Sequence, residues 1–262
     1  MSRRMRNEHG LALLIALLAA VLMIALVFEF AYDTRVSLRA AANLRDAERA
    51  YYLARSGVNF VGKVLADRKK RGMLQEYLEQ KEWMIIPVAG GGDAELKVRW
   101  EDERGKINAA YVREGNAAFN RLSELFMLLQ IDQDVLTRIS DEKKTFVFLD
   151  ELHGFLPDEE FNRAARFLTV YSDDRINVNT APEEVLKALK IDPVLITGPR
   201  STGPIESIGN LSGIDAVKSQ LDVTSDVFSV TALATVGEYS RRVDAVVKRG
   251  SGDFRILYWR SM

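Results

Sequence analysis

Apolar residues are concentrated in one run near the start of the chain. Positions 11–28 read LALLIALLAAVLMIALVF, eighteen residues without a charged side chain. At about 1.5 Å per residue, a helix of that length reaches roughly 27 Å, close to the thickness of a bilayer core. The pattern predicts a transmembrane segment over 11–31.

The residues on either side of this run extend the prediction. Three arginines precede the run against a single acid, Glu8, and a positive flank marks the cytoplasmic side of a membrane. Helix-forming residues continue after the run, with no proline and no glycine before Gly57. The sequence therefore predicts one helix over 11–66, with its N-terminus in the cytoplasm and the rest of the chain across the membrane.

Alternating apolar and polar positions occur in two separate parts of the remaining chain. The first part reads WMIIPV at 83–88 and AELKVRWED at 94–102, and the second, after Val223, reads VFSVTALATVGEY, RRVDAVVKRG and FRILYWR. Alternation between glycine-rich turns is typical of antiparallel strands. We assign 67–112 and 223–262 to one antiparallel sheet that packs on the C-terminal half of the long helix.

The chain between these strands has helical spacing. The candidate helices are 116–129, 132–139, 157–168 and 182–189. Thr180 is predicted to cap the last of them, with Glu183 completing a capping box. The predicted fold class is α+β, with a large inserted all-α domain at 113–222 of SAM-like or helix-hairpin-helix-like character.

Composition excludes several kinds of chemistry. The chain has no cysteine and two histidines, so disulfides, thiolate nucleophiles and Cys- or His-rich metal sites are ruled out. The net charge of −1 gives no general attraction for nucleic acid. His153 lies near Asp150 and Glu151, but the spacing suggests no catalytic triad. We therefore expect no enzyme activity and no required cofactor.

One acidic region is a candidate cation site. The window 132–174 holds eleven acidic against five basic residues. Calcium needs several converging carboxylate oxygens, and the best fragments are Asp132 with Asp134 and Asp173 with Asp174. No D-x-D-x-D-G loop accompanies them, so a solvated acidic face is the alternative.

The basic decapeptide that ends at Gly10 resembles the class III leader of type IV pilins and type II secretion pseudopilins. In that family a prepilin peptidase cuts after the glycine and methylates the new N-terminus. The resemblance implies a leader at 1–10, cleavage between Gly10 and Leu11, and N-methylation of Leu11. A secretory signal peptide is the alternative, but the apolar run exceeds the usual length of about 7–15 residues and no small-x-small cleavage site follows it.

The fifth mature position departs from the usual family pattern. It usually carries a glutamate that neutralises the N-terminal ammonium of a neighbouring subunit, because a charge in hydrocarbon is costly unless it is paired. Here that position is Ile15. In the family, the K-type minor pseudopilin at the filament tip lacks this glutamate, so Ile15 marks a tip subunit.

Further motifs extend the resemblance along the whole chain. DERGKIN at 102–108 is similar to the family pattern D-x-x-G-K-x-N-x-N, although the second Asn is Ala110, and INVNTAPEEVLKAL at 176–189 and the terminal LYWR also match. The residues to which we assign a structural role in these motifs are Asp102, Gly105, Lys106, Asn108, Asn177, Asn179, Thr180 and Pro182.

The segment 176–189 also resembles the opening of helix-hairpin-helix DNA-binding modules. In those modules a glycine-rich hairpin offers backbone N–H groups to a phosphate. Here the hairpin reads LKIDP, without a glycine and with a carboxylate that repels phosphate. We interpret Asn177 and Asn179 as tying a loop to a helix cap, and we expect no nucleic-acid partner.

The resemblance implies a minor pseudopilin of the type II secretion system, a tip component that initiates and caps the pseudopilus for export across the outer membrane. It implies a single-pass inner-membrane protein with a periplasmic soluble domain. The implied partners are the I-type and J-type minor pseudopilins, other pseudopilus subunits and the prepilin peptidase. The alternatives are a type IV pilus minor pilin and a membrane-tethered helix-hairpin-helix DNA-binding protein.

Overall fold

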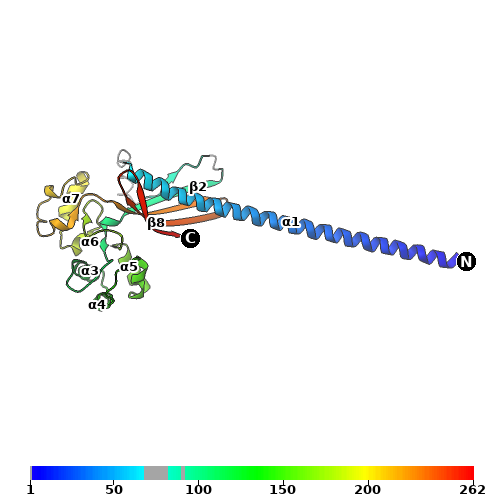
Figure 1. The fold of residues 1–262 in the computed structure, drawn as a ribbon, viewed down its shortest axis with the longest axis horizontal. Helices are drawn as coiled ribbons and strands as arrows, with labels where there is room; N and C mark the ends of the chain where they lie inside the picture. The colour runs from blue at the N-terminus through cyan, green and yellow to red at the C-terminus, as the bar shows by residue number, and fades with distance from the viewer. Residues whose placement is uncertain (1, 68–81, 90–91) are drawn as a thin grey trace.

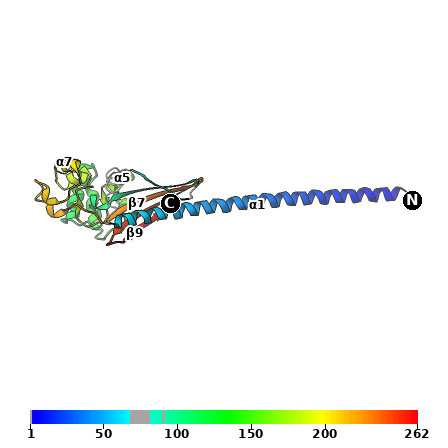
Figure 2. The ribbon, with the colours of Figure 1, turned by 90° about the horizontal axis from the view of Figure 1, so that it is seen from above.

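The computed structural model describes residues 2–67, 82–89 and 92–262. One helix, α1 (Ser2–Ala66), gives the molecule its elongated outline, because its N-terminal part projects far beyond everything else (Figure 1). At about 1.5 Å per residue, such a helix is roughly 100 Å long. Its C-terminal part lies against a sheet, and a block of shorter helices lies beyond its C-terminal end (Figure 1, Figure 2).

Helix α1 runs through Gly10 without a break, whereas the sequence predicts the helix from position 11. A single glycine costs a helix interior about 1 kcal/mol relative to alanine, and this cost is small once the helix is nucleated on both sides. The helical conformation therefore extends into the predicted leader.

The sheet is antiparallel throughout, with the strand order β1-β2-β7-β8-β9. Its strands are β1 (Met84–Ile86), β2 (Ala94–Asp102), β7 (Val227–Val236), β8 (Tyr239–Arg249) and β9 (Phe254–Ser261). Pairing of β2 with β7, for example Val98 opposite Ala232, joins the two distant parts of the chain. The predicted α+β class, with a long helix on an antiparallel sheet, is confirmed.

Apolar residues fill the contact between α1 and the sheet. On β2, Leu96, Val98 and Trp100 are buried in one core with alternate residues of β7 and β8. Helix α1 closes this core mainly over β7 and β8. Gly57 permits the close approach, since a Cβ at this position would lie 2.9 Å from Val98 Cγ1 and 3.2 Å from Ala232 Cβ.

The chain between β2 and β7 folds around a second apolar core. Its helices are α3 (Ala117–Leu128), α4 (Gln133–Asp141), α5 (Asp158–Ala165), α6 (Glu183–Ala188) and α7 (Val194–Thr202). Its two-residue strands are β3 (Ile107–Asn108), β4 (Leu168–Thr169), β5 (Ile176–Asn177) and β6 (Leu221–Asp222). Its 3₁₀ turns are η1 (Glu103–Gly105), η2 (Leu149–Gly154), η3 (Ile208–Asn210) and η4 (Lys218–Gln220).

Two segments of this helical block, 107–169 and 176–222, share one plan. Each opens on an Ile-Asn strand, and the Asn side chain accepts a hydrogen bond from the backbone N–H two residues later. A helix, a Leu-x-Ile-Asp turn and a second helix follow. The variable turn residue has positive φ in both segments, 55° at Gln130 and 60° at Lys190. Each segment ends on the strand that pairs in parallel with its first, so the block consists of two repeated units.

Local helix predictions differ from the structure in three places. Helix α5 ends at Ala165, three residues before the predicted end, and α7 was not predicted. Residue Pro182 is the N-cap of α6, so the predicted capping box at Thr180 is wrong. The Thr180 hydroxyl instead donates to Asp102 at 2.7 Å, because a buried carboxylate distant in sequence is available to it.

The packing at Gly57 gives a test of how α1 contacts the sheet. We expect Gly57→Val to lower the free energy of unfolding by about 1–3 kcal/mol, since the added atoms have no room against β2 and β7. Denaturant unfolding of the protein in detergent, followed by tryptophan fluorescence, measures this. The exposed neighbour Ser56 provides the control, and Ser56→Val should change stability by less than about 0.5 kcal/mol. Equal stability of the two variants would show that α1 does not approach the sheet so closely.

Candidate assembly surfaces: the apolar helix and the interdomain junction

The N-terminal part of α1 has an uncovered apolar surface. By length and composition it is the one candidate membrane span among the described residues, and its most apolar window has a mean hydropathy of 3.2 and is wholly exposed. Leu11 and Ile15 lie on this stretch with 61% and 56% of their surface exposed. An exposed apolar helix of this length suits contact with lipid or with apolar helices of other subunits. Cleavage after Gly10 and methylation of Leu11 stay predictions.

A polar junction connects the sheet to the helical block where β2 ends. The carboxylate of Asp102, the last residue of β2, is buried and accepts hydrogen bonds on both oxygens. Oδ1 accepts from the Arg104 backbone N–H at 2.7 Å, and Oδ2 accepts from Asn177 Nδ2 at 2.6 Å and from Thr180 Oγ1 at 2.7 Å. Burial raises the pKa of this carboxyl above its ordinary value, and hydrogen bonds, including one from Ser225, oppose the shift. The DERGKIN and INVNT motifs therefore meet at one carboxylate.

Glycine is required beside this carboxylate. A Cβ on Gly105 would lie 2.8 Å from Thr180 Oγ1 and 3.0 Å from the Thr180 carbonyl carbon. Any larger side chain would push the loop after β5 away from η1. The glycine of the first motif is thus explained by close approach of the second.

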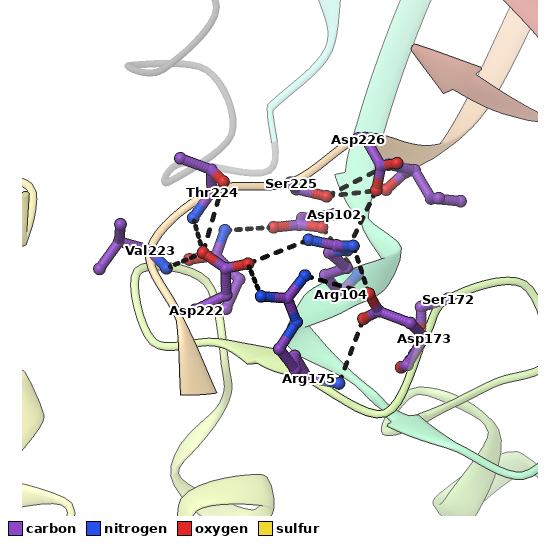
Figure 3. A network of polar contacts seen from close by, with 12 residues as sticks. Asp102, Arg104, Ser172, Asp173, Arg175, Asp222, Val223, Thr224, Ser225 and Asp226 are labelled. Carbon is purple, nitrogen blue, oxygen red and sulfur yellow. Dashed lines mark hydrogen bonds and ion pairs between the residues drawn. The ribbon is translucent and has the colours of Figure 1, made fainter. Parts of the chain in front are cut away.

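Arg104 lies at the centre of a wider ion-pair network (Figure 3). Its guanidinium contacts Asp173 Oδ2 at 2.5 Å and Asp222 Oδ2 at 3.2 Å, while its Nε lies 3.0 Å from Asp226 Oδ1 in an ion pair without hydrogen-bond geometry. Only 11% of the Arg104 side chain is exposed. Arg175 contacts Asp173 and Asp222 from the outer side at 3.6 and 3.4 Å. The aspartates come from the helical block and from the segment that leads into β7.

Lys106 forms a second buried group of ion pairs, next to the network of Arg104. Its Nζ lies 2.6 Å from Glu103 Oε1 and 3.6 Å from Glu101 Oε2. Burial alone lowers the pKa of this lysine, but the two carboxylates outweigh burial and raise its pKa. Lys106 therefore remains charged and holds η1 against the end of β2.

The three asparagines of the motifs fix loops by side-chain hydrogen bonds. Asn108 Nδ2 donates to the Ser172 carbonyl at 2.6 Å. Asn179 Nδ2 donates to the carbonyls of Ile205 and Val223, and its Oδ1 accepts from the Ile205 N–H. Asn179 thus bridges three loops, while Asn177 reaches Asp102. These contacts are broader than the predicted tie between one loop and one helix cap.

The calcium candidates do not converge. Asp132 caps α4, with its Oδ1 accepting from the Asp134 backbone N–H at 3.0 Å, and Asp173 is held by Arg104 and Arg175. Within the described ranges, no group of three or more histidines or acids is placed to hold a metal ion. The candidate residues therefore do not fit a calcium site, and calcium binding stays a prediction of the sequence alone.

The central role of Arg104 is not evident from the sequence. Its carboxylate partners Asp173 and Asp222 are 69 and 118 residues away along the chain. A single arginine within an acidic turn is an ordinary surface pattern, so composition gave no signal. The one available signal was that Arg104 lies within DERGKIN, between two residues that the motif already singled out.

The comparisons with known proteins agree with this architecture. No family model and no curated protein matches the sequence. Among solved structures, a chain of the GspK-GspI-GspJ complex from the enterotoxigenic Escherichia coli type 2 secretion system is similar, with a TM-score of 0.64 and 16% identity. The match covers 87% of this chain and 99% of that chain. This chain therefore shares the fold of a chain in that complex, in agreement with the pseudopilin resemblance of the sequence motifs.

The Asp102 carboxylate gives a test of the junction. In Asp102→Asn an NH2 group replaces one of the two accepting oxygens, so at least one donor that now bonds to Asp102 loses its acceptor. We therefore expect the free energy of unfolding to fall by about 1–3 kcal/mol. Denaturant titration of the protein in detergent measures the loss. Glu95→Gln on the same strand is the control, because its pair with Lys97 is exposed and worth at most about 1 kcal/mol. A loss no larger than that of the control would contradict the role of Asp102.

Proposed function

We propose that this chain is a minor pseudopilin of a type II secretion system and that it occupies the tip of the pseudopilus, where it initiates and caps assembly for export across the outer membrane. The observation that carries the proposal is the fold shared with a chain of the GspK-GspI-GspJ complex over nearly the whole of both chains. The same comparison supports partners of the I and J type, since the similar chain comes from a complex of three such subunits. The protein acts by assembly, and no enzyme activity is proposed.

The position of the helical block supports a place at the tip. The block lies past the C-terminal end of α1, opposite the membrane-directed N-terminus (Figure 1). In a filament whose subunits stack along their long helices, this block occupies the space that a subunit above would need. Its attachment through buried polar contacts at Asp102 and Arg104 keeps it in that position.

The apolar part of α1 supports an inner-membrane anchor, with the sheet and helical block in the periplasm. Between the end of the predicted span at 31 and Ala47, the first buried residue of α1 from Gly10 onward, the helix rises about 24 Å. The sheet is therefore held away from the bilayer. An anchor of this kind requires that processing remove only residues before the apolar run, as the prepilin peptidase does.

Processing by that peptidase is tested at Gly10. We expect the intact mass of the protein extracted from membranes to correspond to a chain that begins at a methylated Leu11. Gly10→Val should leave the leader attached, because the cleavage site no longer has the required residue. Ala12→Val, which adds similar bulk outside the scissile bond, should be processed normally. A mature chain that begins beyond Phe28 would establish a secretory signal peptide instead.

The tip position is tested at Ile15. A shaft subunit gains from a carboxylate that pairs with a neighbouring ammonium, whereas a tip subunit has no subunit above it and would bury an unpaired acid at a cost of several kcal/mol. We expect Ile15→Glu to weaken recovery of the I-type and J-type partners with the tagged chain and to leave secretion unchanged or impaired. Ile15→Leu should behave as the native chain. Stronger recovery with Ile15→Glu, or many copies of the native chain along the filament, would contradict a tip position.

A further inference from the structure

One edge of the sheet, along β9, has no further strand among the described residues. Strand β9 is the last in the strand order, and no described strand lies beyond it (Figure 2). Arg242 and Met262 exchange backbone hydrogen bonds at 3.0 and 2.9 Å, so they form a hydrogen-bonded pair. Because such pairs alternate in an antiparallel ladder, the N–H and C=O groups of Trp259 and Ser261 point away from β8. These groups are the acceptors and donors that an added strand would use.

The open edge is positively charged. Strand β9 itself holds two basic side chains and no acidic side chain, although the whole chain has a net charge of −1. Arg255 and Arg260 lie on β9 itself and are exposed. The pair between Arg260 and Asp150 is 3.3 Å long, and both side chains are more than half exposed, so it holds Arg260 only weakly.

We propose that β9 binds an extended, acidic segment of a partner protein as an additional strand of the sheet. Backbone bonds to Trp259 and Ser261 provide the affinity, and acidic side chains opposite Arg255 and Arg260 provide the selectivity. This inference rests on the sheet edge and is independent of the place of the chain in a filament.

The arginines on β9 also argue against a second copy of this chain as the strand that pairs with β9. Pairing of two β9 edges would bring the arginines of both copies together, and like charges on paired strands are destabilising. Cationic residues and the bulge between Val246 and Val247 are devices that discourage pairing with arbitrary strands. They leave the stretch 258–262 regularly paired with β8 and without a described strand on its other side, and this stretch is long enough to pair with a short acidic strand.

The probe is a fluorescent, N-acetylated peptide of nine residues with alternating Glu and Val, titrated into the full chain in detergent micelles. We expect saturable binding by fluorescence anisotropy, and the binding should weaken as salt screens the arginines. The same peptide with Lys in place of Glu should not bind. Methylation of the peptide nitrogens that face β9 should abolish binding, because it removes their hydrogen atoms.

Two pairs of variants locate the site on β9. Ser261→Pro removes an outward N–H without touching the ladder to β8, so it should weaken peptide binding about five- to tenfold, whereas Ser261→Ala should not. Arg255→Glu combined with Arg260→Glu should reverse the preference toward the Lys peptide. Arg241→Glu, a single substitution of the same kind on the inner strand β8, should leave the preference for the Glu peptide unchanged.

Several results would overturn the proposal. These are absence of binding by the Glu peptide, equal binding of the Glu and Lys peptides, and full binding of the methylated peptide. Full binding to Ser261→Pro would also place the peptide elsewhere. Dimers of the native chain that Ser261→Pro abolishes would show that the occupant is a second copy. If Ser261→Pro unfolds, as circular dichroism would reveal, the methylated peptide still decides the question on the native chain.

Discussion

The buried carboxylate of Asp102 is the contact on which the arrangement of this protein depends. It ends the last strand before the helical block and accepts hydrogen bonds from residues 75 and 78 positions later in the chain. A buried carboxylate without donors is costly, so the loop that carries Asn177 and Thr180 must return to this point. The Arg104 network then adds ion pairs to the same turn. Polar contacts of this kind are directional, and they specify one orientation of the helical block more than they add to stability.

Helix α1 combines two environments in one continuous element. Its C-terminal part follows ordinary packing rules, with small residues such as Ala54 and Gly57 where the sheet approaches closely. Its N-terminal part is apolar on all sides and has no cover within the described chain. The helix therefore joins a folded domain directly to a surface that requires lipid or partner helices. Because the helix is continuous, it transmits the position of its apolar part to the sheet without a flexible linker.

The helical block is attached where β2 ends, so it does not add a strand to the edge of the sheet at β9. One sheet edge ends on β9, and no described strand pairs with the outer side of β9. The block itself is built from two copies of a strand-helix-turn-helix-strand unit, with a left-handed residue at the same turn position in each. In the second unit the Asn of the opening strand reaches Asp102, whereas in the first unit Asn108 reaches the Ser172 carbonyl. Both units contact the sheet, since Phe148 and Asp150 of the first unit lie against Tyr258 and Arg260 of β9.

Local patterns in the sequence were enough to predict the long helix, the strands of the main sheet and the helices α3 to α6, but not α7. The long helix and the five strands follow from apolar periodicity, and the fold class follows from their order along the chain. Patterns could not assign the hydrogen-bond partner of the Thr180 hydroxyl, because the same hydroxyl can cap a helix or contact a distant carboxylate. Nor could they find Arg104 or the duplicated unit, since the partners of Arg104 are far away in sequence and the two copies share few residues. Only the tertiary structure brings the two motifs to one carboxylate, because burial and hydrogen-bond geometry depend on which distant segments meet.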